Sequence, residues 1–250
     1  MDKEDACQMT ENPTSQAARP VATPAAAAAR ACWDCQAEVG AEHFCSACGK
    51  IQPTPPATDY FTFFALPRKL ALDAAALERR FEQLSWKLHP DNFHRATAYE
   101  QELSLEKTAA LNDAFRTLRD PVARVEYLLG LEGVRREGEI KQQAPPDLLA
   151  EVFELNEYLE ELRDARRTMG DAREMEELKH RLEKARSSFQ EKMDGVLSEL
   201  TAQFRRWDEL VDSNGDAALR QPVLQAMSEI LNRHSYIRNL VRNVSEELEE

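Results

Sequence analysis

The sequence is poor in glycine, in long apolar runs and in positive charge. Only 8 of its 250 residues are glycine, which leaves few positions for the tight turns that join short β-strands. No apolar stretch approaches the roughly 20 residues that a helix needs to cross a bilayer. Lysine and arginine number 32 against 45 aspartates and glutamates, so the formal net charge is −13. This balance argues against general binding to nucleic acids or anionic membranes, because like charges repel.

The amino-terminal stretch lacks the features of a targeting peptide. It begins MDKEDACQ, which is acidic and has no apolar core, so it is not typical of a secretory signal. Its early acidic residues also fit an arginine-rich mitochondrial presequence poorly, and we expect a cytoplasmic protein. Residues 1–30 are rich in alanine, proline and threonine and have almost nothing to bury, which predicts a disordered tail.

The rest of the chain predicts an all-α protein. Apolar residues recur at helical spacing from Asp59 onward, first in a helix over 73–88 and then in a second over 97–120. Further helices open at Pro121 and run over 147–163, and two long heptad-patterned helices follow them. Three consecutive helices joined by short turns predict an antiparallel three-helix bundle. The predicted parts are a tail over 1–30, a cysteine knuckle over 31–52, a compact helical domain over 59–132 and a bundle over 145–250.

Four of the five cysteines form two Cys-x2-Cys pairs separated by nine residues, in the segment CWDCQAEVGAEHFCSACGK. Each pair can direct two thiolates at one ion, and two pairs complete a tetrahedral site. We predict structural zinc with the ligands Cys32, Cys35, Cys45 and Cys48. A redox dithiol, two disulfides and iron in a rubredoxin-like site are the alternatives. A closed four-thiolate site leaves no position for a substrate, so we expect a scaffold or docking role. The Pro-rich segment QPTPPATD that follows reads as an extended linker.

The segment LSWKLHPDNFH ends a predicted helix with the triplet His89, Pro90 and Asp91. Pro90 cannot continue a helix, so the triplet is expected on a tight turn between two helices. One flank of the helix before it is basic and suits an acidic partner, through Arg79, Arg80 and Lys87. The triplet lacks companions for catalysis, since the chain has no phosphate loop and no nucleophile elbow. A bare His-Pro-Asp is a weak motif, and an ordinary helix stop explains most occurrences of it.

The helix predicted over 147–163 carries two apolar groups. Its core stripe consists of Leu148, Val152, Leu155, Leu159 and Leu162. Leu149 and Phe153 fall beside this stripe and are bordered by glutamates. Such a pair suits a partner-binding face, whereas a broad core stripe with a solvated acidic edge is the alternative.

From DYFTFFAL through the His-Pro-Asp turn to LNDAFRTL, the sequence resembles a J domain. The segments LRDPVARVEYLL and DLLAEVFELNEYLEEL make it similar to the HscB family of co-chaperones in iron–sulfur cluster assembly. A cysteine block before the domain is similar to the longer HscB form of animal mitochondria.

The resemblance implies an adaptor that binds two proteins and is not itself an enzyme. Its His-Pro-Asp loop and basic helix would stimulate the ATPase of an HscA/DnaK-type chaperone, and the chain itself would bind no nucleotide. The bundle would bind the iron–sulfur scaffold IscU, through Leu149, Ala150, Phe153, Glu154, Glu157, Glu161 and Tyr236. An adaptor for another client is the main alternative, and a rubredoxin-like redox protein a weaker one. No nucleic acid or membrane partner is expected.

Overall fold

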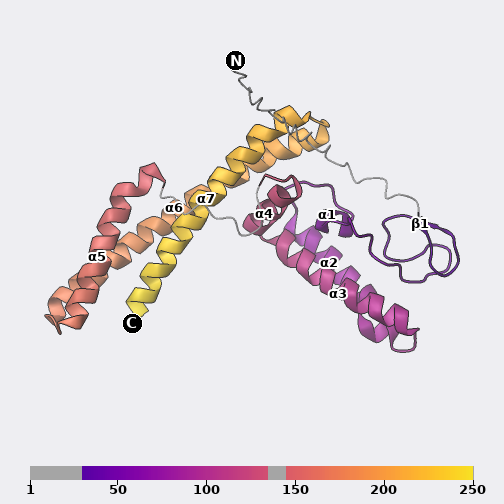
Figure 1. Ribbon diagram of the computed structural model, residues 1–250, viewed down its shortest axis with the longest axis horizontal. Coiled ribbons are helices and arrows are strands. Elements are labelled where there is room, and N and C mark those ends of the chain that lie inside the picture. Colours follow the sequence, from indigo (N-terminus) through magenta and orange to yellow (C-terminus); the bar gives the residue numbers. More distant parts are fainter. Residues whose placement is uncertain (1–29, 135–144, 250) are drawn as a thin grey trace, which may run out of the picture.

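The computed structural model describes residues 30–134 and 145–249, so the predicted tail lies outside it except for Arg30. In these ranges the chain forms helices and one short two-stranded ribbon, which confirms the predicted all-α class (Figure 1). No helix there is long and apolar enough to span a membrane. The elements are β1 Arg30–Ala31, β2 Glu38–Val39, α1 Tyr60–Phe63, α2 Ala74–Leu88, the 3-10 helix η1 Pro90–Phe93, α3 Ala98–Arg119, α4 Pro121–Leu131, the 3-10 helix η2 Pro146–Leu148, α5 Leu149–Arg167, α6 Ala172–Asp212 and α7 Ala217–Glu249.

Local capping signals fix where the helices begin. The Asp73 carboxylate accepts two backbone N–H groups from the first turn of α2, and Asp120 does the same for one N–H of α4. Pro121 occupies the first turn of α4, where its missing N–H is not needed. Thr97 and Glu100 form a reciprocal capping box at the start of α3. These starts agree with the sequence prediction because each signal acts within one turn.

Helices α2 and α3 form an antiparallel hairpin around the predicted apolar stripes. Leu84, Leu88 and Leu111 are buried between them, and the rings of Phe81 and Phe115 stack with centroids 4.1 Å apart. The α3 hydroxyls of Ser104 and Thr108 both donate to the carbonyl of Leu88, at 2.6 and 3.1 Å. That carbonyl belongs to the last residue of α2 and would otherwise lack a partner, so α3 closes the end of α2.

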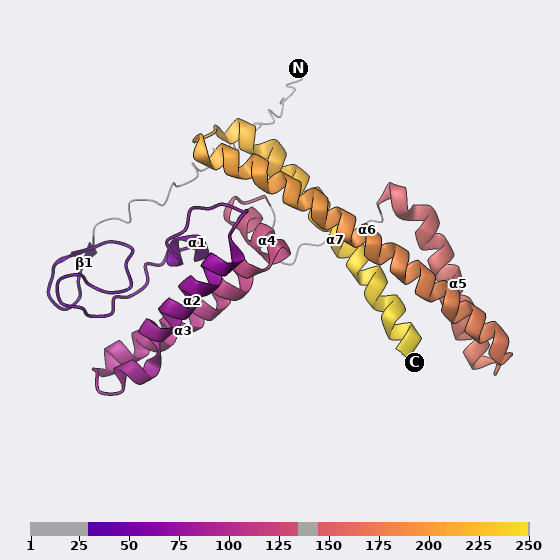
Figure 2. The ribbon, with the colours of Figure 1, turned by 180° about the vertical axis from the view of Figure 1, so that it is seen from behind.

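Helices α6 and α7 form a second, longer hairpin whose two ends pack against different partners (Figures 1 and 2). One end packs on α5, where the predicted core stripe of α5 is buried. Glu247 of α7 also accepts Arg163 Nε at 2.7 Å and Arg166 from α5 at 2.6 Å. The antiparallel three-helix bundle is confirmed, but α5 covers only part of the length of the long hairpin.

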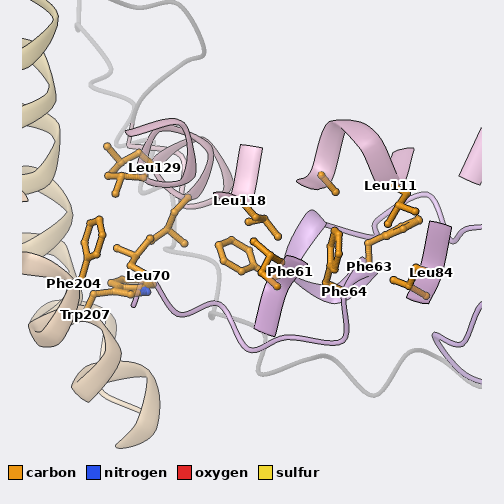
Figure 3. Packing of buried hydrophobic residues seen from close by; sticks show 14 of the residues in the cluster. Phe61, Phe63, Phe64, Leu70, Leu84, Leu111, Leu118, Leu129, Phe204 and Trp207 are labelled. Atoms are coloured by element: carbon orange, nitrogen blue, oxygen red, sulfur yellow. The ribbon is translucent and has the colours of Figure 1, made fainter. Parts of the chain in front are cut away.

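The other end of the long hairpin shares a hydrophobic core with the region 59–134. Figure 3 shows Phe204 and Trp207 of α6 directed toward Leu70 and Leu129. Six residues of α6 and α7 belong to this core: Leu200, Phe204, Trp207, Leu224, Met227 and Leu231. The heptad pattern of α6 correctly predicts that Leu200, Phe204 and Trp207 are buried, but part of their cover comes from the α4 region rather than from a third bundle helix.

Polar contacts lock this junction at the loop that precedes α2. The indole Nε1 of Trp207 donates to the Arg68 carbonyl at 2.7 Å. The next residue, Asp208, accepts the backbone N–H groups of Leu70 and Ala71 at 2.7 and 3.0 Å. The loop has no secondary structure to satisfy these groups, so α6 supplies their partners.

Asp208→Ala is therefore expected to lower the free energy of unfolding by about 1–3 kcal/mol, because two backbone donors lose a charged acceptor. Urea unfolding followed by circular dichroism measures the change. Asp212→Ala is the matched control: its carboxylate is 65% exposed and pairs only with Lys69, so it should cost about 1 kcal/mol or less. Equal losses in the two variants would contradict the proposed importance of the junction.

Candidate functional site

The cysteine block folds as two equivalent knuckles. In the first, the Gln36 N–H donates to the Cys32 carbonyl at 3.1 Å, and in the second the Gly49 N–H donates to the Cys45 carbonyl at 2.9 Å. Both donor residues adopt left-handed backbone conformations, with φ of +62° and +72°. Only the second knuckle has glycine at this position. The sequence pattern CxxCG therefore predicts the left-handed turn of the second knuckle but not that of the first.

The four thiol groups converge on one point. Their sulfurs lie within 4.8 Å of one another, and the pairs Cys32–Cys48 and Cys35–Cys45 are each 3.7 Å apart. A tetrahedral ion with metal–sulfur bonds of about 2.3 Å requires sulfurs roughly 3.8 Å apart. The geometry therefore fits a four-thiolate metal site, with the predicted ligands and no others.

Donors around Cys32 favour its thiolate. The buried side chain of Gln52 donates to Cys32 Sγ at 3.2 Å, and the Asp34 N–H lies 3.4 Å from the same sulfur. Burial opposes ionisation of Cys32, but hydrogen bonds from Cys35, Asp34 and neighbouring thiols outweigh it and lower its pKa to about 6. A thiolate is the form that binds metal.

The knuckle packs directly against the helices, so the Pro-rich segment after it does not act as a spacer. His43 Nε2–H donates to the Phe63 carbonyl at 3.1 Å, and Lys107 of α3 donates to His43 Nδ1 at 3.3 Å and to Thr54 at 3.0 Å. Burial, and then the charge of Lys107, lower the pKa of His43 to about 4. Burial likewise lowers the pKa of Lys107 to about 8. Ile51, near the end of the predicted knuckle segment, is fully buried in the main core. The prediction that this segment acts as a linker between separate units is therefore wrong.

Lys107 and Glu100 are buried charged residues that the sequence prediction missed. Lys107 lies four residues after Leu103 and four before Leu111, within the apolar stripe of α3. A lysine in such a stripe indicates a partner from another part of the chain. Glu100 follows Thr97 by three residues, the spacing of a capping box.

The His-Pro-Asp triplet lies exposed where α2 gives way to η1. The side chains of His89 and Asp91 are 53% and 89% exposed. His89 Nδ1 accepts the Asp91 N–H at 3.3 Å, and Asn92 Nδ2 donates to the Trp86 carbonyl at 2.6 Å. The turn thus holds its backbone with its own polar groups, while imidazole and carboxylate face outward.

The basic flank of α2 is also exposed. Arg79, Arg80 and Lys87 are all solvent-accessible, as predicted from the helical wheel. Trp86 lies on the outer face of the same helix with 79% of its surface exposed, and the sequence prediction did not single it out. A large exposed indole beside positive charge is a typical feature of protein-binding surfaces.

The α5 surface separates the two alternatives for Leu149 and Phe153. Both are exposed, at 44% and 71%, while the five residues of the core stripe are buried. Ala150, Glu154, Glu157 and Glu161 are exposed as well. Tyr236 lies on α7 and is partly buried against the bundle core that the α5 stripe also joins. The role of each of these residues in binding stays a prediction.

The chain is similar to HscB proteins in sequence and in structure. It is 36% identical to the iron-sulfur cluster co-chaperone protein HscB of Mus musculus over 132 residues, 51% of this chain and 56% of that protein. Chaperone HscB from Vibrio cholerae superposes with a TM-score of 0.51 at 28% identity, covering 76% of this chain and 96% of that structure. Human co-chaperone protein HscB superposes with a TM-score of 0.54 at 25% identity, covering 87% and 98%. No family model matches the chain.

The helical hairpin with its His-Pro-Asp loop, the four-thiolate knuckle and the C-terminal helices define a J-domain protein of the co-chaperone class. Within that class, the proteins that the chain resembles in sequence and in structure are HscB co-chaperones. The sequence matches span 52–63% of the length of three of these curated relatives.

Purified protein is expected to hold one metal ion per chain, and Cys32→Ser or Cys45→Ser should remove it because three thiolates leave the tetrahedron open. Elemental analysis gives the stoichiometry and identity. Ser46→Ala, between two ligands, should retain the ion. We expect colourless zinc; red absorbance from iron would instead favour the rubredoxin-like alternative.

Proposed function

We propose that the protein is a co-chaperone that stimulates the ATPase of an HscA/DnaK-type chaperone and delivers the scaffold IscU to it. The J-domain loop would contact the chaperone, and the α5 surface would contact the scaffold. The observation that carries this proposal is the presence of two exposed and chemically different surfaces on one rigid frame. The names of its relatives, iron-sulfur cluster co-chaperone proteins, support the proposal.

Charge supports the chaperone side. The whole chain carries −13, yet the exposed flank of α2 next to the His-Pro-Asp loop presents three cations. Local positive charge on an acidic protein favours an acidic partner surface and speeds encounter with it. Asp91 is 89% exposed and lies 3.6 Å from His89 Nδ1, so its carboxylate is accessible to a bidentate pair from an arginine of that partner.

The α5 surface supports a second partner of different chemistry. Phe153 is exposed although the helix has a complete buried stripe of its own, so the fold does not explain its position. Glutamates surround it, which suits a partner with an apolar pocket bordered by basic groups. Figures 1 and 2 show this helix and the α2/α3 hairpin far apart in the molecule, so both partners fit at once.

His89→Gln is expected to reduce stimulation of the chaperone ATPase to background while scaffold binding stays unchanged. The side chain is exposed and outside the core, so the fold should tolerate the change. The measurement is steady-state ATP hydrolysis by an HscA-type chaperone with and without the co-chaperone. His180→Gln, exposed on α6 away from the loop, is the control and should stimulate normally. Full stimulation by His89→Gln would remove the assigned role of the loop.

Phe153→Ala is expected to weaken scaffold binding by about 1–3 kcal/mol, roughly 5- to 150-fold in Kd, as for a buried interface anchor. Titration calorimetry with purified IscU measures it. Leu219→Ala, 60% exposed at the start of α7, should leave Kd unchanged. The whole chain must be used, because a fragment over 145–250 would expose Phe204 and Trp207. If the wild-type chain does not bind IscU, the alternative of another client is favoured.

A further inference from the structure

The cysteine knuckle contacts α3 at its first turn. Lys50, two residues after the ligand Cys48, donates to both carboxylate oxygens of Glu100 at 2.9 and 3.0 Å. The Glu100 side chain is only 6% exposed. An edge-on contact between Trp33 and Tyr99, with ring centroids 5.1 Å apart, lies at the same turn.

Glu100 is also the residue that closes the capping box of α3. Its carboxylate accepts the Thr97 N–H at 3.2 Å and the Thr97 hydroxyl at 2.9 Å, while the Thr97 hydroxyl accepts the Glu100 N–H at 3.3 Å. Lys50 therefore neutralises a buried carboxylate that holds the start of α3. Without that cation the carboxylate would be a buried charge with no counter-ion, which destabilises the fold.

Side chains from the N-terminal half of α3 bind the backbone at both ends of the loop 88–96, which contains the His-Pro-Asp triplet. At one end, Ser104 and Thr108 bind the Leu88 carbonyl, directly before His89. At the other end, Gln101 Nε2 donates to the Ala96 carbonyl at 3.1 Å. A displacement of the first turn of α3 would therefore reach the loop directly through the hydrogen bond from Gln101 to the Ala96 carbonyl.

We infer that the metal-bound knuckle is a brace for the His-Pro-Asp loop: it positions Lys50 on Glu100, and the anchored first turn of α3 fixes the loop. Lys50 is a positioning residue, without contact to the predicted chaperone-binding residues. Metal binding orders the knuckle because the four thiolates come from two separate turns. Loss of the ion releases Lys50 and loosens the start of α3. The consequence for chaperone stimulation rests on the proposed function, but the consequence for the order of α3 does not.

Hydrogen exchange of the zinc-loaded full chain, with Lys50→Met as the variant, tests the brace. The amides of Thr97, Glu100 and Gln101 should exchange about tenfold faster in the variant, the change expected when a charge-assisted hydrogen bond is removed. Elemental analysis should show that zinc remains bound, since Lys50 is not a ligand. Lys69→Met, which removes a lysine–carboxylate pair at the junction with α6 instead, is the matched control and should leave these amides unchanged.

Removing zinc with a chelator completes the test. In the wild-type chain it should accelerate the same amides about as much as Lys50→Met does, and in Lys50→Met it should add little. Unchanged exchange in Lys50→Met with zinc bound, or equal and additive effects of chelation in both proteins, would overturn the brace. Chaperone stimulation by Lys50→Met should fall severalfold. The His89→Gln assay tests the proposed function separately, so failure of one does not imply failure of the other.

Discussion

The burial of Trp207 beneath the loop that precedes α2 is the contact on which the arrangement of the molecule depends. It joins the end of the long α6/α7 hairpin to the J domain through one shared apolar core and through hydrogen bonds from the indole and from Asp208. Two domains connected only by a chain segment would move independently. Here a continuous core fixes the direction of the hairpin, and so the position of α5 relative to the His-Pro-Asp loop.

The knuckle is likewise held against the J domain by packing and hydrogen bonds, on the side opposite the long hairpin. A small four-thiolate unit has almost no core of its own, here Cys32, Val39 and Cys45. It gains stability from the metal and from a neighbouring surface. Lys107 and Glu100 provide that surface, with their charges satisfied by His43, Thr54 and Lys50. Buried charges cost free energy unless they are paired, so these contacts indicate a specific docking geometry rather than a flexible tether.

The two proposed binding surfaces lie outside the buried faces of the helices. The stripes of α2, α3, α5 and α6 are buried in the two cores, and the caps occupy the helix ends. The α2 flank with its loop, and Phe153 with its neighbouring glutamates, have no such structural explanation. Exposed apolar side chains such as Phe153 lower the solubility of a monomer, which supports the binding role proposed above.

The sequence by itself determined the helices, their buried faces and the metal ligands. Asp73, Pro90 and Thr97 act on the backbone within one turn, and Cys-x2-Cys spacing brings two sulfurs to one ion without help from distant residues. For the same reason the outward position of His89 and Asp91 was predictable: a proline stops the helix wherever the rest of the chain lies.

Only the tertiary structure decided what covers each face. Periodicity in α6 marks Phe204 and Trp207 as buried but is silent on their partner, which is a loop more than 130 residues earlier in the sequence. Periodicity could not predict that Lys107 lies beneath His43 or that Lys50 pairs with Glu100. A buried charge is stable only where another segment of the chain supplies its hydrogen-bond partner or counter-charge. Local signals fix helices, whereas the choice among buried neighbours depends on packing that forms only when the whole chain folds.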